Sequence, residues 1–387
     1  MFSTRAEWRQ PLNRLTQAKQ ARRARGEAIL DLTESNPTKV GLDYPLDELA
    51  AAFAAAARAS YEPDPRGLRS AREALAISLA CSPDDLVLTA STSEAYAYLF
   101  KLLMNPGDEI ATAAPTYPLL DHLAAFESLN LKHFPLEREG SHWALHIPEL
   151  ERIVTEKTRA VVVVHPNHPV GSYLTESEQG ALTAFCSERR IALISDEVFF
   201  DDAIDAPHRA GPAASRDEGL VVSLGGLSKS AGLPHYKLGW IRVGGAAEAK
   251  RDALEALELI ADSYLSVSTP VQAALPRLLE IAPAIRGQIA ARVRRNLDAL
   301  RAAVAPDKSL QLLPVEGGWS AVLRIPRVAS DEQVALRLLD ESGVLIHPGY
   351  FFDFASDGYL VVSLLPAPET FDAGIAKIAR FSADFWR

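Results

Sequence analysis

The stretch Val221–Val243, which reads VVSLGGLSKSAGLPHYKLGWIRV, decides how the rest of the chain is interpreted. Two apolar, β-type runs, 220–224 and 238–243, flank a loop rich in glycine and serine. The loop carries Lys229 between two serines, and a second cation, Lys237, precedes the next run. Small residues let backbone N–H groups approach an anion, and a lysine near another cation is activated as a nucleophile. A solvated loop lysine is the commoner interpretation of such a residue, so the rest of the chain must decide between the two.

Length and composition limit the class of protein. The chain has 387 residues, which is more than one typical core, and its 48% hydrophobic content is typical of a globular protein. The net charge of −10 argues against a nucleic-acid partner, because binding phosphates requires a basic face. The N-terminus is polar, no apolar run approaches the ~20 residues of a membrane span, and two cysteines are too few for a disulfide framework. We therefore expect a reduced, cytoplasmic protein with no membrane partner.

Predicted strands alternate with helices through the middle of the chain. The strands are expected at 85–89, 109–113, 131–134, 159–164, 191–194, 220–224 and 238–243. The run RAVVVV at 159–164 is apolar on both faces, which is typical of a strand that is buried on both sides. This alternation predicts an α/β fold with a mostly parallel sheet and helices on both faces.

The pattern changes beyond residue 245. Long helical patterns at 246–264 and 271–302 are followed by short strands and helices, which predict a smaller α+β domain. We expect an N-terminal arm that is part of the small domain, a large cofactor-binding domain and a small C-terminal domain, at residues 1–45, 46–270 and 271–387, respectively.

Side chains suited to chemistry follow five of the predicted strands. Because ligands gather at the carboxyl ends of parallel strands, we expect these side chains to meet in one site. They are Thr92 and Ser93, Tyr117, His168, Asp196 and Lys229. Each also has a simpler interpretation: a helix cap, a loop aromatic, a structural salt bridge. A metal site at His165 and His168 is discounted, because prolines break the spacing and no cysteine or carboxylate cluster joins them.

In their order along the chain, these motifs resemble those of the class I/II aminotransferases, which are fold-type I enzymes dependent on pyridoxal 5'-phosphate (PLP). The resemblance covers nearly the whole chain from Ser35 onward. It is carried by S-x-S-K at Lys229, by GLPHYKLGW after it, by DEV beginning at Asp196, and by HPNHPVG at 165–171, which is similar to N-P-N-N-P-T-G.

The resemblance implies a role for each of these residues. Lys229 would form a Schiff base with PLP and then act as general base and acid. Asp196 would keep the pyridine nitrogen protonated, Tyr117 would stack on the ring, and His168 would donate to the 3-oxygen. The residues expected at the cofactor phosphate are Thr92, Ser93, Ser228, Lys237 and, from a neighbouring subunit, Tyr61; Ser35 is expected to be on the substrate side.

Several positions depart from the family pattern. Gly226 stands where a hydroxyl residue is common, Phe199 where a tyrosine is usual, and Val361 where an arginine clamps the substrate carboxylate. A valine cannot replace that bidentate cation. Either another cation binds the carboxylate, for which the candidates are His168, Arg66, Arg69 and Arg324, or the substrate is an amine or amino acid that is held in an unusual way.

The resemblance therefore predicts a PLP-dependent aminotransferase that moves an amino group from an amino acid to a 2-oxo acid. It also implies a homodimer with shared active sites. The nearest alternative is a PLP-dependent lyase or decarboxylase on the same fold, which the missing arginine favours. A second alternative is a non-catalytic PLP-binding paralogue.

Overall fold

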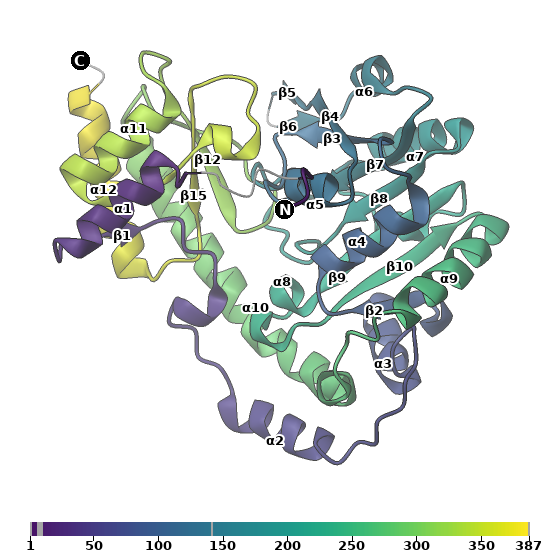
Figure 1. The fold of residues 1–387 in the computed structure, drawn as a ribbon. Helices are drawn as coiled ribbons and strands as arrows, with labels where there is room; N and C mark the ends of the chain where they lie inside the picture. The colour runs from purple at the N-terminus through teal and green to yellow at the C-terminus, as the bar shows by residue number, and fades with distance from the viewer. Residues whose placement is uncertain (1, 6–10, 141, 386–387) are drawn as a thin grey trace.

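A seven-stranded sheet forms the centre of the computed structural model, which describes residues 2–5, 11–140 and 142–385. The strand order is β2-β10-β9-β8-β7-β3-β4 (Figure 1). Neighbouring strands from β9 to β4 are parallel, and β10 is antiparallel to both of its neighbours. The mostly parallel α/β sheet is thus confirmed. Its strands are β2 (Leu86–Thr89), β3 (Glu109–Ala114), β4 (Asn130–Pro135), β7 (Thr158–Val164), β8 (Ala192–Asp196), β9 (Leu220–Gly226) and β10 (Gly239–Gly245).

Strand β7 explains why both faces of the sheet are covered. Side chains alternate along a strand, so Val162 enters one apolar core whereas Val161 and Val163 enter another on the opposite face. Burying both sets removes apolar surface from water, which stabilises the fold by roughly 25 cal/mol for each Å² that is buried. The helices of the Val162 side are α4 (Thr92–Leu103), α5 (Leu120–Phe126) and α9 (Ala247–Asp262), and those of the other side are α6 (Ile147–Ile153) and α7 (Glu176–Arg189).

A second, four-stranded antiparallel sheet, in the order β11-β12-β15-β14, packs against helices on one side. Both ends of the chain contribute to this part of the molecule, because Leu30 of β1 pairs with Val344 of β13. The elements are α1 (Arg14–Ala24), β1 (Leu30–Asp31), β11 (Gln311–Leu312), β12 (Ser320–Arg324), α11 (Asp331–Arg337), β13 (Val344–Leu345), β14 (His347–Pro348), β15 (Tyr359–Ser363) and α12 (Pro368–Phe385).

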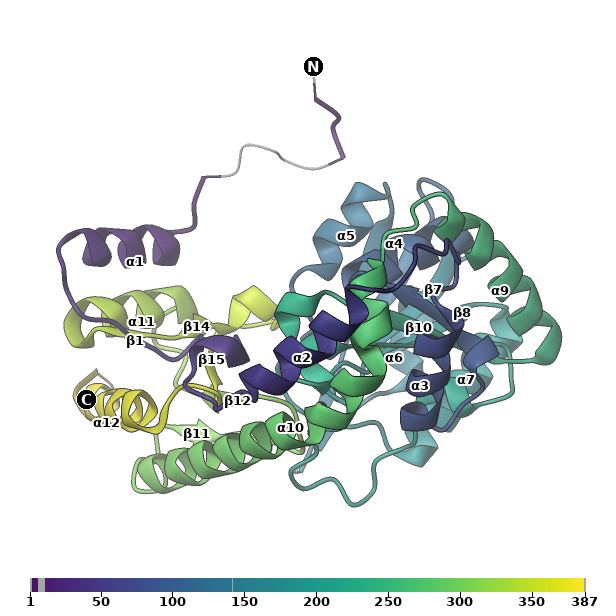
Figure 2. The same cartoon turned by 90° about the horizontal axis from the view of Figure 1, so that it is seen from below.

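Helix α10 (Thr269–Val304) connects the two sheets (Figure 2). It packs against α2 (Leu46–Ala56) and α3 (Arg69–Leu79) near its beginning and against α12 and β11 near its end. One apolar core extends from α2 and α3 along α10 to the four-stranded sheet. Because this core continues across residue 270, the domain boundary that we predicted there remains a proposal. None of the helices in the described part of the chain is long and apolar enough to cross a membrane.

The hairpin of β5 (Glu137–Glu139) and β6 (His142–Ala144) was not predicted, because its residues are mostly charged and lack an apolar alternation. It supplies His142, whose Nδ1 lies 2.9 Å from Glu316 Oε1 and whose Nε2 lies 3.2 Å from Glu178 Oε2. Glu178 completes a capping box at the start of α7, and Glu316 precedes β12. The two carboxylates, Glu178 first, raise the pKa of His142 to about 10. A protonated imidazole thus links α7, which covers the large sheet, to the segment that precedes β12 of the four-stranded sheet.

We expect His142→Gln to destabilise the fold by about 2 kcal/mol, since a hydrogen bond to a charged group contributes roughly 1.5–3 kcal/mol. Because the pKa is raised above its ordinary value of 6.5, the stabilisation is complete below about pH 6.5 and is lost as the pH rises towards 10. Urea unfolding of both proteins at several pH values measures this. A difference that grew towards high pH would contradict the assignment.

Candidate functional site

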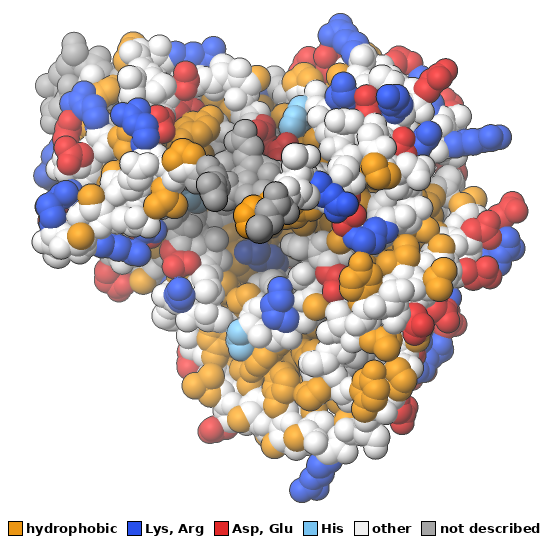
Figure 3. All heavy atoms as spheres, in the orientation of Figure 1, with side chains coloured by type: hydrophobic (Ala, Val, Ile, Leu, Met, Phe, Trp, Pro, Cys, Tyr) orange, Lys and Arg blue, Asp and Glu red, His pale blue; other side chains and the backbone are white. Residues whose placement is uncertain are grey.

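A cavity of about 380 Å³ lies at the carboxyl ends of β3, β7, β8 and β9, between the two sheets. In the space-filling view it corresponds to the hollow between the two parts of the molecule (Figure 3). The cavity brings together nearly every residue predicted for the site. These are Ser35, Thr92, Ser93, Tyr117, His168, Asp196, Ser228, Lys229 and Lys237.

Lys229 lies in α8 (Leu227–Ser230), a single helical turn between β9 and β10. The turn is fixed because Ser230 Oγ donates to Gly226 O at 3.0 Å and Leu227 N donates to Leu238 O at 3.0 Å. Burial lowers the pKa of the Lys229 amine, against the opposing effect of two carboxylates. A lower pKa increases the fraction of neutral amine, which is the nucleophilic form.

Asp196 is the last residue of β8, and its side chain is buried. Tyr96 Oη donates to Oδ2 at 2.9 Å, and the backbone N–H of Val198 donates to Oδ1 at 3.2 Å. Burial outweighs these bonds and raises the pKa of Asp196 to about 6. Neither hydrogen bond supplies a cation, so this carboxylate would gain from a positively charged group in the cavity.

An anion site is built where α4 begins beside the α8 turn. Ser91 caps the helix by accepting from Glu94 N at 3.2 Å, so Thr92 and Ser93 occupy its first turn. The N–H groups of a first turn have no partner within the helix, and the helix dipole favours an anion there. A side chain at Gly239 would come within 3.0 Å of the Ser91 backbone, so glycine permits this close approach.

Ser228 and Lys237 complete the anion site from the segment after β9. Lys237 lies two residues before β10. Its φ of +52° is in the left-handed region. Gly226 lines the same wall, but a glycine has no side chain and therefore adds no hydroxyl to the anion site. A phosphate group would therefore meet one lysine, three hydroxyl side chains and a helix start.

We expect Lys237→Gln to weaken PLP binding about 10- to 100-fold, because a charge-assisted hydrogen bond contributes roughly 1.5–3 kcal/mol and each 1.4 kcal/mol is a factor of ten. Equilibrium titration of the apoprotein with PLP measures the change. Lys157→Gln, an exposed lysine in a loop before β7, is the control and should leave the affinity unchanged. Equal losses in both variants would show that Lys237 has no specific role.

The opposite wall of the cavity is aromatic. His168 stacks on Phe199 with ring centroids 5.8 Å apart and meets Phe352 edge-on at 5.4 Å. Burial, followed by the charge of Lys229, lowers the pKa of His168 to about 3, so the imidazole is neutral near pH 7 and offers one N–H. Tyr117 follows β3 at the same end of the sheet, and burial raises the pKa of its hydroxyl to about 12.

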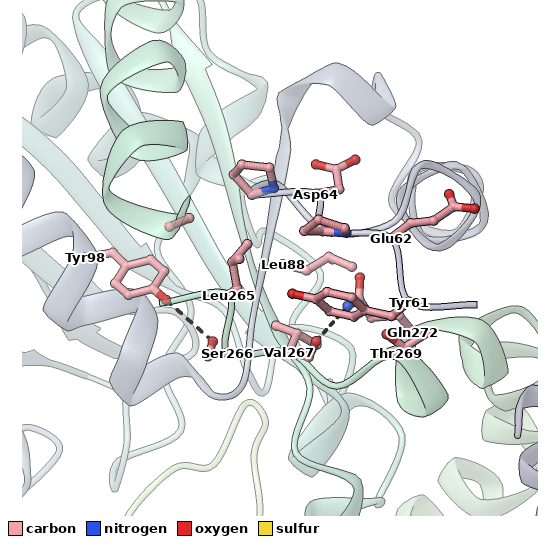
Figure 4. Close-up of a pocket in the computed structure, with 14 residues that line it drawn as sticks. Tyr61, Glu62, Asp64, Leu88, Tyr98, Leu265, Ser266, Val267, Thr269 and Gln272 are labelled. Carbon is pink, nitrogen blue, oxygen red and sulfur yellow. Dashed lines mark hydrogen bonds between the residues drawn. The ribbon is translucent and has the colours of Figure 1, made fainter. Parts of the chain in front are cut away.

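Tyr61 is the predicted residue that does not line this cavity. Its side chain is 70% exposed and borders a separate, small pocket with Tyr98, Leu265 and Gln272 (Figure 4). It cannot reach the anion site of its own chain from there without rearrangement. Its exposure leaves it available to a second subunit, which is the role that the resemblance implied.

The three arginines considered for a substrate carboxylate do not line the cavity. Arg66 pairs with Glu258 at 2.9 Å, Arg69 pairs with Glu73 at 2.8 Å, and Arg324 is exposed at the end of β12. Val361 is 2% exposed and belongs to an apolar core. Of the candidate cations, His168 is therefore the one that the fold brings to the cavity, and it is neutral.

Sequence reasoning missed Trp319, Ser320 and Asp202. Trp319 and Ser320 line the cavity from the start of β12, and Asp202 lies behind Trp319. The available signal was the sequence Gly-Gly-Trp directly before a predicted strand, where two glycines let a large ring approach another segment.

Comparisons with known proteins agree with the motifs. The family model described as aminotransferase class I and II matches residues 27–377. A glutamate-pyruvate aminotransferase of Haemophilus influenzae is 24% identical over 377 residues, covering 93% of this chain and 92% of the relative. An arginine–pyruvate transaminase of Pseudomonas aeruginosa is 27% identical, covering 94% and 92%. Among solved structures, an alanine aminotransferase of Pyrococcus furiosus superposes with a TM-score of 0.89 at 21% identity, covering 99% of this chain and all of that one.

Proposed function

The chain belongs to the aminotransferase class I and II family and is a PLP-dependent aminotransferase, and we propose that Lys229 is the residue to which the cofactor is attached. The observation that carries this proposal is the position of the Lys229 amine, with its lowered pKa, in the same cavity as the Asp196 carboxylate and the anion site. An amine, a carboxylate and an anion site are the three groups that PLP needs from a protein.

The residues of the cavity fit the cofactor. Asp196 is a buried carboxylate without a cationic partner in its hydrogen bonds, and a protonated ring nitrogen would supply one. Thr92, Ser93, Ser228 and Lys237 would hold the phosphate, and Tyr117 and His168 would contact the ring and its 3-oxygen. When bound, PLP supplies an aldehyde for amines and a ring that accepts electrons from the donor's α-carbon.

The amine of Lys229 would do the proton transfer. Its pKa is lowered by burial, so a neutral amine would be available to take the proton from the donor's α-carbon and to deliver it to the former aldehyde carbon of the cofactor. Phe199 and Trp319, which are 7% and 2% exposed, give the amine an apolar wall on one side. Tyr96 would act through Asp196, by holding the carboxylate in position.

The substrates are an amino donor and a 2-oxo acid, and the relatives support small acceptors. Two of the relatives are named for pyruvate, so pyruvate is the acceptor that we propose. The donor is less constrained, because no arginine lines the described cavity.

We also propose a homodimer that shares its active sites. Tyr61, Tyr264 and Leu265, which are 70%, 51% and 37% exposed, supply apolar surface near the loop between α9 and α10. Hydrophobic side chains gather on this lower part of the molecule (Figure 3). Analytical ultracentrifugation should give twice the mass of the 387-residue chain.

The test of the proposed function is a visible spectrum of the purified, PLP-loaded protein before and after addition of single amino acids. Conversion of the cofactor absorbance, followed by its recovery when pyruvate is added, is the expected result. Release of ammonia or carbon dioxide without a 2-oxo acid would instead indicate the lyase or decarboxylase reaction. No absorbance at any PLP concentration would refute the proposal.

A further inference from the structure

A buried carboxylate that the transfer reaction does not use lies beside the cavity. The Oδ2 atom of Asp202 is buried and has no partner within hydrogen-bond distance in the described part of the chain. The polar group nearest in effect is the indole N–H of Trp319, which opposes the rise that burial causes in the pKa of this carboxyl. Its backbone is fixed on two sides: Asp202 N donates to Phe199 O at 2.9 Å, and Gly318 N donates to Asp202 O at 3.0 Å. Asp202 is therefore held between the segments that carry Phe199 and Trp319.

The same two residues present aromatic rings to the cavity. The Lys229 Nζ atom lies 4.9 Å from the centre of the Trp319 ring and 5.4 Å from that of Phe199, and the two rings meet edge-on at 5.2 Å. An ammonium over aromatic faces is attracted by their negative π-surface. Burial lowers the pKa of Lys229, and the carboxylates of Asp202 and then Asp196 oppose this effect, so Asp202 is the group that most favours a cation at this position.

Attachment of the cofactor would take the free amine of Lys229 out of this position. Once Lys229 carries PLP, the rings and Asp202 face the substrate side without it. Lys237 belongs to the anion site, and Arg286 forms an ion pair with Asp201 at 3.3 Å. No arginine lines the cavity within the described residues. The substrate side thus combines two aromatic faces with one carboxyl group, Asp202, whose pKa burial raises to about 7, so it carries a negative charge above that pH.

We propose that the amino donor carries a second cationic group, as basic amino acids and diamines do, and that Phe199, Trp319 and Asp202 recognise it. This inference rests on the proposed function and specifies its donor. The rings would contact the cation, and Asp202, lying behind Trp319, would supply the negative charge. Asp202 is then a specificity-determining residue.

The test compares L-lysine with L-norleucine, which share the carboxylate and the carbon chain and differ in the terminal ammonium. With the PLP-loaded protein, kcat/KM of the donor half-reaction is expected to be at least about 10-fold higher for lysine. Asp202→Asn should reduce this preference to less than about 3-fold and leave the norleucine rate nearly unchanged. The matched control is Asp201→Asn, at the exposed neighbouring carboxylate, which should keep the preference.

A binding measurement accompanies the kinetics. Calorimetry with butyltrimethylammonium, which cannot react with the cofactor, should show binding to the PLP-loaded wild type that Asp202→Asn weakens at least about 10-fold. If the wild type reacts equally well with both amino acids, or if Asp202→Asn keeps the preference, the inference is refuted while the transferase remains. If no amino acid reacts, the proposed function fails, and the calorimetry alone decides on the cation site. Should Asp202→Asn not fold, Trp319→Leu replaces it with the same expected loss.

Discussion

Replacing Lys229 by alanine is expected to abolish amino transfer, with a loss on the order of 10⁴-fold or more, because general acid–base catalysis alone contributes roughly 10²–10⁴-fold and the attachment point of the cofactor is removed as well. The structure explains why no neighbour would substitute. The other lysine of the cavity, Lys237, belongs to the anion site at the start of α4. Single-turnover spectra with an amino donor and pyruvate measure the loss.

Covalent attachment gives a second readout that does not depend on turnover. Borohydride reduction followed by mass spectrometry should fix PLP to the wild type at Lys229 and leave the alanine variant unlabelled. Lys237→Gln, assayed at saturating PLP, is the matched control and should still be labelled. Labelling of the Lys229→Ala protein at another lysine, with retained turnover, would move the assignment to that residue.

Replacing Asp196 by alanine should reduce kcat by about 10²–10³-fold, in line with the removal of one preorganised electrostatic contact from an active site. The carboxylate would hold the proton on the ring nitrogen, and without it the ring withdraws electrons less effectively. Because the pKa of Asp196 in the free protein is raised to about 6, PLP affinity of the wild type should also fall below pH 6, as the carboxyl becomes protonated. The variant should lose this pH dependence.

The adjacent residue supplies the control for this experiment. Glu197 is also a buried carboxylate, with its pKa raised to about 7 by burial, but it accepts from Ala213 N at 2.7 Å and does not line the cavity. Glu197→Gln should therefore preserve kcat to within a few-fold. If the two variants lost activity equally, the effect of Asp196 would be structural.

The strand pattern made most of the large sheet predictable. A run such as RAVVVV is buried on both faces, so it requires helices on both sides, and the carboxyl ends of the parallel strands then bring distant residues together. The antiparallel direction of β10 could not be predicted, because apolar alternation does not encode direction. The β5–β6 hairpin was not predicted because its strands are short and carry charged residues, and because Glu178 and Glu316, the partners of His142, are distant in sequence.

The substrate side of the site was less predictable than the cofactor side. The motif at Lys229 and the strand end at Asp196 are local patterns, whereas Asp202 and Trp319 meet across more than a hundred residues of sequence. The expectation of an arginine near the substrate rested on residue type alone. Arg66 and Arg69 have carboxylate partners elsewhere, and only the fold reveals that these side chains are already engaged.

The pairing of β1 with β13 has a consequence for how the chain is made. Val344 follows its partner Leu30 by more than three hundred residues along the chain, so it is synthesised much later. The strands of the large sheet lie between them in the sequence, so this sheet can assemble before β1 has a partner to pair with. Long-range pairings of this kind are slow and leave apolar side chains such as Leu32 uncovered in the meantime. During synthesis, the segment around β1 therefore stays accessible to a chaperone until β13 has been made.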